Sequence, residues 1–217
     1  EGFVRRLWKE MCGYDVPPIK RMPYREAMED YGIDRPDTRY DLKIRDISEV
    51  AAKCDFGVFK DALAKGAERP KYNSGRGVVK ALRVPGGAEK LTRKITDGYT
   101  EFVKGFGAGG AAVVKVNAQG AFETGIAKFV EPIKAELVAA LGLQPGDTVF
   151  FLADTYAIAT KAIGELRQKV ARDMGVVPKR ADSFGNQAYS TKIMEFMSLG
   201  VPVVVSRTQI DQFYFND

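Results

Sequence analysis

The stretch "QPGDTVFFLADTYAIATKAIGELRQKVARDM", residues 144–174, decides the fold. The turn residues in "QPGD" precede "TVFFLAD", an apolar run rich in aromatic side chains that predicts a strand at 148–154. Asp154 is then predicted to cap the longest helix of the chain. The apolar stripe of this helix is predicted to contain Ile158, Ala162, Ile163, Leu166, Val170 and Met174. A strand that turns directly into a long helix is therefore the expected centre of the core.

Shorter elements surround this pair. Strands are predicted for "YDLKIRDIS" at 40–48, "GVVKALRV" at 77–84 and "AAVVKV" at 111–116, and Ser48 is expected to cap the turn after the first. Helical spacing and helix punctuation predict helices at 3–11, 23–32, 92–106 and 131–142, with Gly32 ending the second and Thr92 as the N-cap of the third. The helices and strands do not alternate regularly, so the pattern favours the α+β class.

Composition excludes several kinds of protein. The longest apolar runs, such as "VPVVV" at 201–205, are far shorter than the roughly 20 residues that cross a bilayer, so no membrane partner is expected. The chain has no histidine, and Cys12 and Cys54 form no CxxC pair, so no metal site is expected. The two cysteines are expected to be buried, reduced thiols of a cytoplasmic protein. The lack of histidine also excludes Ser-His-Asp and Cys-His chemistry within this chain.

The formal net charge of +5 is concentrated in the middle of the chain, where residues 48–128 hold 14 basic and 8 acidic side chains. Within that part, residues 65–94 contain nine Lys or Arg against two Glu. Such a density of cations on loop-rich backbone suits contact with nucleic-acid phosphates, for which the candidates are Lys71, Arg76, Arg93 and Lys94. The alternative is a solvated basic loop that serves solubility.

Residues 19–42, "IKRMPYREAMEDYGIDRPDTRYDL", carry the pattern Y-x-E-A-M-x-x-Y-G-x-D-x-P-D-x-R from Tyr24 to Arg39. This run resembles the segment of bacterial-type aspartyl-tRNA synthetases that follows the second class II motif. The runs "VVKALRVPGGA", "IAKF" at 126–129, "PGDTVFFLAD" and "AIGELRQKVARDMG" are similar to the GAD insertion domain of those enzymes and to the return into their catalytic domain. The resemblance covers about residues 1–176.

The resemblance implies a domain organisation. Residues 1–47 would be part of a class II catalytic domain, 48–153 a GAD insertion domain with an antiparallel sheet and packed helices, and 154–176 a return helix. The parent enzyme would use ATP and Mg²⁺ to activate aspartate, transfer it to tRNA in the cytoplasm, and could form a homodimer. In the family the insertion domain lies beside the tRNA acceptor arm, which gives the basic segment a weak, electrostatic RNA partner.

No catalytic residue is expected within the chain. The resemblance places the arginine of the second class II motif before residue 1 and the arginine of the third motif beyond the matching part. Loss of one donor that stabilises a transition state typically costs about 10²–10³ in rate, so the chain is expected to be an inactive fragment that binds no cofactor by itself. Asp34, Asp37 and Arg39 could form a site, but a charged, hydrogen-bonded turn explains them equally and is favoured.

Residues 177–217 change character, with a predicted helix in "GNQAYSTKIMEFMSLG" and a predicted strand in "VPVVVS". This tail resembles part of the nucleotide-sugar half of family 4 glycosyltransferases of the GT-B fold. The resemblance implies that Lys192 approaches the donor diphosphate and Glu195 the ribose hydroxyls, although Gln187 replaces an acidic residue common in relatives. The alternative is an exposed helix pair of little energetic weight.

Three hypotheses follow from the sequence. The first is a fragment of an aspartate–tRNA ligase whose insertion domain contacts tRNA. The second is a nucleotide-sugar-binding glycosyltransferase fragment, and the third is a chimeric α+β module without activity, with a junction near residues 176–179. Only the first accounts for the basic segment and for residues 1–176 together.

Overall fold

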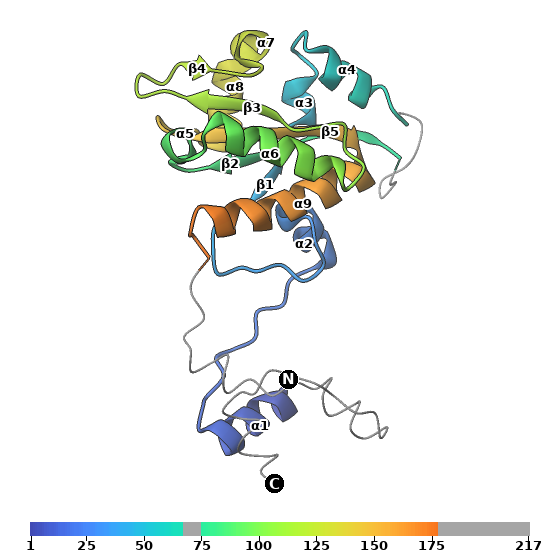
Figure 1. Cartoon of the computed structure of the whole chain (residues 1–217). Helices are drawn as coiled ribbons and strands as arrows, with labels where there is room; N and C mark the ends of the chain where they lie inside the picture. The colour runs from blue at the N-terminus through green and yellow to red at the C-terminus, as the bar shows by residue number, and fades with distance from the viewer. Residues whose placement is uncertain (67–74, 178–217) are drawn as a thin grey trace. The chain divides into compact units, whose positions relative to one another are not determined.

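The computed structural model of this chain describes residues 1–66 and 75–177. The chain divides into two compact units, Glu1–Val176 and Val177–Asp217, and the described helices and strands all lie in the first unit. Figure 1 shows these elements, which succeed one another along the chain as α1 (Gly2–Cys12), α2 (Tyr24–Tyr31), β1 (Ile44–Asp46), α3 (Ser48–Ala51), α4 (Gly57–Leu63), β2 (Gly77–Val84), α5 (Gly87–Lys90), α6 (Arg93–Lys104), β3 (Ala112–Val116), β4 (Phe122–Glu123), α7 (Ala127–Val130), η1 (Glu131–Ile133), α8 (Lys134–Leu141), β5 (Thr148–Thr155) and α9 (Tyr156–Asp173).

The strands form an antiparallel sheet in the order β1-β2-β5-β3-β4. Its longest ladder joins β2 to β5, from Gly77 opposite Thr155 to Val84 opposite Thr148. Both strands are buried over nearly their whole length, because helices cover both faces of the sheet. The predicted α+β class and antiparallel sheet are confirmed.

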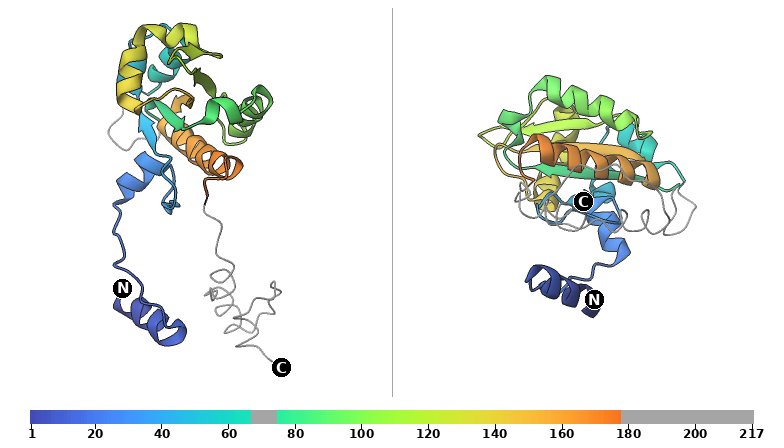
Figure 2. Two further views of the ribbon diagram at one scale, coloured as in Figure 1. Left: turned by 90° about the vertical axis from the view of Figure 1, so that its left-hand side faces the viewer. Right: turned by 60° about the horizontal axis from the view of Figure 1, so that its bottom comes forward.

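Alternate residues of the central strands feed two separate apolar layers. Val79 and Ala81 of β2 face the same way as Val149 and Phe151 of β5, and they pack with buried residues of α3, α4, α7 and α8. On the other face α9 lies along β2 and β5, and the ring of Tyr99 in α6 meets that of Phe150 at a centroid distance of 5.5 Å. Figure 2 shows α6 and α9 on one side of the sheet.

Two predicted caps are wrong. Helix α9 begins after Thr155, without a side-chain cap bond, because β5 continues through that residue. The Asp154 carboxylate instead accepts hydrogen bonds from the Thr155 amide at 2.7 Å and from Lys65 Nζ at 3.0 Å. Ser48 is the first residue of α3 rather than its cap, and its hydroxyl bonds Asp46 and the Val79 amide where β1 meets β2.

The apolar faces of α1 and α9 are buried to different extents. In α9 the middle of the predicted stripe is buried, whereas Ile158 and Met174 at its ends are only half-buried. In α1 no residue is buried within the described part of the chain, and Phe3 is 76% exposed. Both cysteines are free thiols, and Cys54 is buried as predicted. The prediction of burial is wrong for Cys12, which is exposed because no residue of α1 is buried among the described residues.

Candidate nucleic-acid interface

The predicted RNA-contacting residues lie at different places. Lys71 lies outside the described residues, as do the other residues from 67 to 74. Arg76 directly precedes β2, where its half-exposed guanidinium is 3.7 Å from an Asp46 carboxylate oxygen and its carbonyl accepts a hydrogen bond from the Tyr156 amide. Arg76 is therefore partly engaged within the protein.

Arg93 and Lys94 are the first two residues of α6, after Thr92, which is the N-cap as predicted. The Arg93 side chain is 94% exposed and its Nε lies 3.7 Å from Asp97. Lys94 and the nearby Lys90 of α5 are also exposed, and within residues 1–66 and 75–177 neither has an ion-pair partner. We call Lys90, Arg93 and Lys94 the basic end.

The basic end is electrostatically unusual for the start of a helix. The first turn of α6 contains no carboxylate, although the partial positive charge of a helix N-terminus favours acidic side chains there. Cations in this position add to the field of the unpaired backbone N–H groups instead of offsetting it. The arrangement gives up a small amount of helix stability and concentrates positive potential that suits an anion.

The structure separates Arg76 from the basic end. The eight residues of β2 lie between them, and at roughly 3.3 Å per residue they span about 26 Å. Arg93 and Lys94 are thus brought together, and Arg76 is not brought to them.

Counting charges along residues 65–94 overstates the field of this segment. Lys80 is fully buried against Glu29 and Asp46, and Arg83 Nε donates to the buried carboxylate of Asp147 at 2.6 Å. The partners come from other parts of the chain, so a sum over one segment cannot register them. Among the described residues of this segment, the outward-facing charge without a strong internal partner is concentrated at the basic end.

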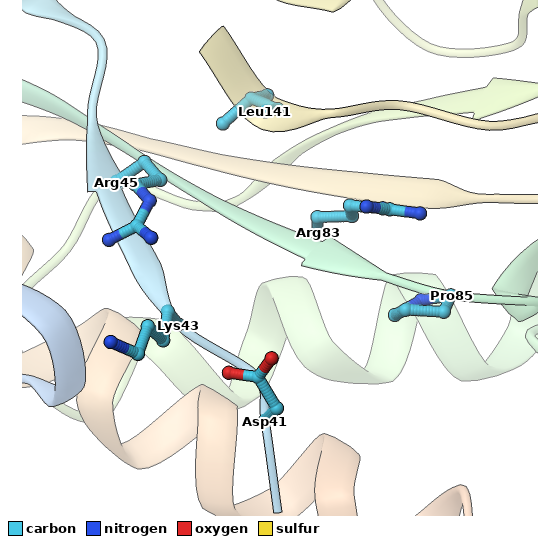
Figure 3. A pocket seen from close by; sticks show the side chains of 6 residues that line it. All are labelled: Asp41, Lys43, Arg45, Arg83, Pro85 and Leu141. Carbon is cyan, nitrogen blue, oxygen red and sulfur yellow. The ribbon is translucent and has the colours of Figure 1, made fainter.

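A basic groove beside β1 was missed in the sequence. Its volume is about 390 Å³, and it is lined by Asp41, Lys43, Arg45, Arg83, Pro85 and Leu141 (Figure 3). Figure 3 shows the nitrogen ends of Arg45 and Arg83 pointing in different directions. The Asp30 carboxylate holds Lys43 at 2.9 Å and Arg45 at 3.2 Å, so these cations are already paired. The alternation of Lys43 and Arg45 about Ile44 was the signal that could have revealed this groove.

The predicted charged turn at residues 34–39 is built around Asp37. Its carboxylate accepts hydrogen bonds from Arg39 Nε at 2.9 Å, Arg39 Nη2 at 2.6 Å and the Arg39 amide at 3.1 Å. These bonds stabilise the charged form and lower the pKa of Asp37 to about 2. Its oxygens are used within the turn, which supports the structural interpretation over a site.

The remaining predicted features concern metals, membranes and the tail. Within the described ranges, no group of three or more His, Cys, Asp or Glu is arranged to hold a metal ion. No helix among the same residues has the length and apolar character needed to cross a bilayer. Lys192 and Glu195 lie outside the described residues, as does most of the tail.

Comparison with known proteins agrees with this architecture. Residues 71–163 match the model of the GAD domain, so the chain contains a GAD domain. The chain is 42% identical to the aspartate–tRNA(Asp/Asn) ligase of Nitratidesulfovibrio vulgaris over 186 residues. The matched stretch covers 85% of this chain and 28% of that protein. It is 38% identical to the aspartate–tRNA ligase of Macrococcus caseolyticus and 40% identical to that of Staphylococcus carnosus, each over 85% of this chain and 30% of the relative.

The chain therefore has aspartate–tRNA ligases as homologues and spans less than a third of the length of these curated relatives. The resemblance of residues 1–176 to such enzymes is supported. The domain boundaries at 47, 153 and 176 and the glycosyltransferase resemblance of residues 177–217 stay predictions.

Proposed function

We propose that this chain is the GAD-containing part of an aspartate–tRNA ligase, which couples aspartate to tRNA with ATP and Mg²⁺ in the cytoplasm. The observation that carries the proposal is identity of 38–42% to such ligases over 85% of the chain, together with a GAD domain at 71–163. A homodimer is part of the same proposal for the complete enzyme.

Within that enzyme, the role that we assign to these residues is contact with the tRNA backbone. The basic end presents three exposed cations, Lys90 at the end of α5 and Arg93 and Lys94 at the start of α6, and among the described residues only Arg93 forms an ion pair. Lysine and arginine on an exposed surface neutralise phosphates and release counterions, and they do so without reading sequence. The groove beside β1 would be a weaker second contact, because Asp30 and Asp147 already neutralise its cations.

Filter binding of tRNA at several salt concentrations tests this assignment. Replacing Lys90, Arg93 and Lys94 with alanine should reduce the slope of log K against log salt by up to about 2.7, at about 0.9 for each duplex phosphate that is no longer neutralised. Arg76→Ala should change the slope less, because Arg76 lies beyond the far end of β2 and near Asp46.

A matched control removes the same charge from the opposite face of the sheet. Lys53, Lys60 and Lys134 lie in or beside α3, α4 and α8, and each pairs with a nearby carboxylate. Their triple alanine variant should keep the wild-type slope. Equal slopes for the two triple variants would refute the assignment of the basic end, and no retention of tRNA at low salt would refute RNA contact by this chain altogether.

The nucleotide-sugar prediction for the tail has an independent test. It requires saturable binding of a nucleotide sugar that Lys192→Ala weakens, measured by calorimetry. Absence of binding heat would remove it without affecting the ligase proposal.

A further inference from the structure

The GAD model matches residues 71–163, but the folded body that contains them is larger. The segment 24–46, which holds α2, β1 and the turn between them, is fastened to β2 and α9 at three places. At the first, Lys80 of β2 is fully buried and pairs with Glu29 of α2 and, at 3.3 Å, with Asp46 of β1. The ammonium group also lies 5.2 Å from the centre of the Tyr156 ring.

Tyr156 closes this first fastening. Its hydroxyl donates to the Glu29 carboxylate at 3.0 Å, so Glu29 is held by β2 and α9 together. Burial and the Glu29 charge raise the pKa of Tyr156 to about 12, which keeps its hydroxyl protonated as a donor at neutral pH.

The second fastening is Arg167, a fully buried residue of α9. Its guanidinium donates to the backbone carbonyls of Asp37 at 2.9 Å and Tyr40 at 3.2 Å, to the carbonyl of Leu42, and to the Tyr40 hydroxyl at 3.1 Å. The rings of Tyr31 and Tyr40 lie 4.8 and 4.2 Å from the guanidinium carbon. One side chain therefore satisfies three backbone carbonyls of the turn between α2 and β1.

The third fastening is a contact between two backbones. Gly32 ends α2 with a φ of 74°, and a Cβ there would lie 2.6 Å from the Thr160 carbonyl oxygen. A Cβ on Gly164 would lie 2.8 Å from the Gly32 carbonyl oxygen. Only glycine at both positions permits α2 and α9 to pack this closely.

The chain loses such attachments at both ends of this body. Residues 13–22 contain no helix or strand, and apart from Val16 and Met22 they are exposed. At the other end α9 stops at Asp173, and Gly175 has a φ of 68°. Residues 24–173 are thus bounded by two short connections with few tertiary contacts.

We propose that the described residues between 24 and 173, which are 24–66 and 75–173, move as one rigid body. Lys80 and Arg167 would be the residues that position segment 24–46 on it, and the pivot would lie at 13–23 and 174–177. The functional consequence of this inference rests on the proposed function. The basic end would keep a fixed orientation relative to segment 24–46 while tRNA binds. The limits of the moving part would not be those of the GAD model.

Hydrogen exchange read by mass spectrometry tests this on the chain without any ligand. Peptides from 24–46 should show protection within about tenfold of peptides from β2 and β5, because segments of one cooperative unit exchange through the same opening. Peptides from 13–23 should exchange at least about 100-fold faster. Protection of 24–46 about 100-fold weaker than that of β5 would overturn the proposal, whatever any variant does.

Variants then test whether the buried charge of Lys80 couples segment 24–46 to the sheet. Lys80→Met should lower the protection of 24–46 at least about tenfold while β5 changes less than about threefold. Lys65→Met removes a lysine–carboxylate pair that lies outside the segment, in which Lys65 Nζ is 3.0 Å from Asp154. This variant should leave the protection of 24–46 unchanged. Equal effects of the two variants would refute the role of Lys80.

The tRNA experiment separates this inference from the proposed function. Lys80→Met keeps the basic end, so its salt slope for tRNA should match the wild type. Loss of RNA binding in the wild type would refute the function and leave the exchange result standing, whereas early exchange of 24–46 would refute the rigid body and leave the function standing.

Discussion

Replacing Arg167 with methionine should destabilise the fold more than almost any other single exchange of a charged residue. Methionine retains a long apolar stem but no donor, so the carbonyls of Asp37, Tyr40 and Leu42 lose their partner. An acceptor left unsatisfied in the interior costs about 1–3 kcal/mol. The Asp37 carbonyl is in a half-buried residue and can rehydrate, whereas Tyr40 and Leu42 are buried.

The two buried carbonyls set the expected size of the effect. They give a loss of about 2–6 kcal/mol, partly offset because the variant no longer buries a charge. Burial of this charge does cost free energy, because it lowers the pKa of Arg167. We expect a net loss of about 3 kcal/mol, a large part of the roughly 5–15 kcal/mol that stabilises a typical domain.

Urea unfolding followed by circular dichroism measures this loss from the shift in midpoint at an unchanged m-value. Arg172→Met is the matched control, because Arg172 is exposed on the same helix. Among the described residues its side chain donates only to the Gln168 carbonyl, at 3.2 Å. It should leave the free energy of unfolding within about 0.5 kcal/mol of wild type. A loss below about 1 kcal/mol for Arg167→Met would refute the claim that this guanidinium holds the turn.

Three further outcomes are expected. Because the pKa of Asp37 is lowered from 3.8 to about 2, its contribution to stability is complete above pH 4 and is lost as pH falls toward 2; Asp37→Asn should remove that part of an acid-unfolding curve, and an identical curve would contradict it. Gly164→Ala should lower the free energy of unfolding by about 1–3 kcal/mol through its clash with Gly32, despite alanine's better helix propensity, and a neutral or stabilising result would exclude the contact. Glu29→Gln should lower the pKa of Tyr156 from about 12, which alkaline absorbance titration detects, and no change would mean that Glu29 does not face the ring.

Apolar periodicity and helix-terminating residues predicted the local structure well where neighbouring residues alone decide it. The strand at 148–154 and the helix after it follow from an apolar run and a 3.6-residue stripe, and both exist. Thr92 and Gly32 were correctly predicted to bound α6 and α2, since caps and left-handed glycines act on their own neighbours. Asp154 failed as a cap because the sheet pairing of β5 extended past it.

The charged residues show the limit of reading along the chain. Lys80 lies in an apolar strand and Arg167 lies beside the apolar stripe of a helix. Such patterns predict core positions, and they do not indicate that a buried cation is among them. The partners of Lys80 lie 34 and 51 positions away, and those of Arg167 lie 125 to 130 positions away. No local pattern connects residues at such separations, so neither the buried pair nor the arginine in the turn could be predicted.

The sequence by itself determined the longer helices and strands, the α+β class, and the likeness to aspartate–tRNA ligases, because these depend on neighbouring residues and on long matching runs. It did not predict the short elements α4, β4 and α7. Only the tertiary structure decided which cations face outward. Pairing depends on distance in space, and folding brought carboxylates from distant segments onto Lys80 and Arg83 while leaving Lys90 and Lys94 without partners among the described residues. The tertiary contacts also join segment 24–46 to the sheet, because the buried Lys80 and Arg167 find their partners in that segment.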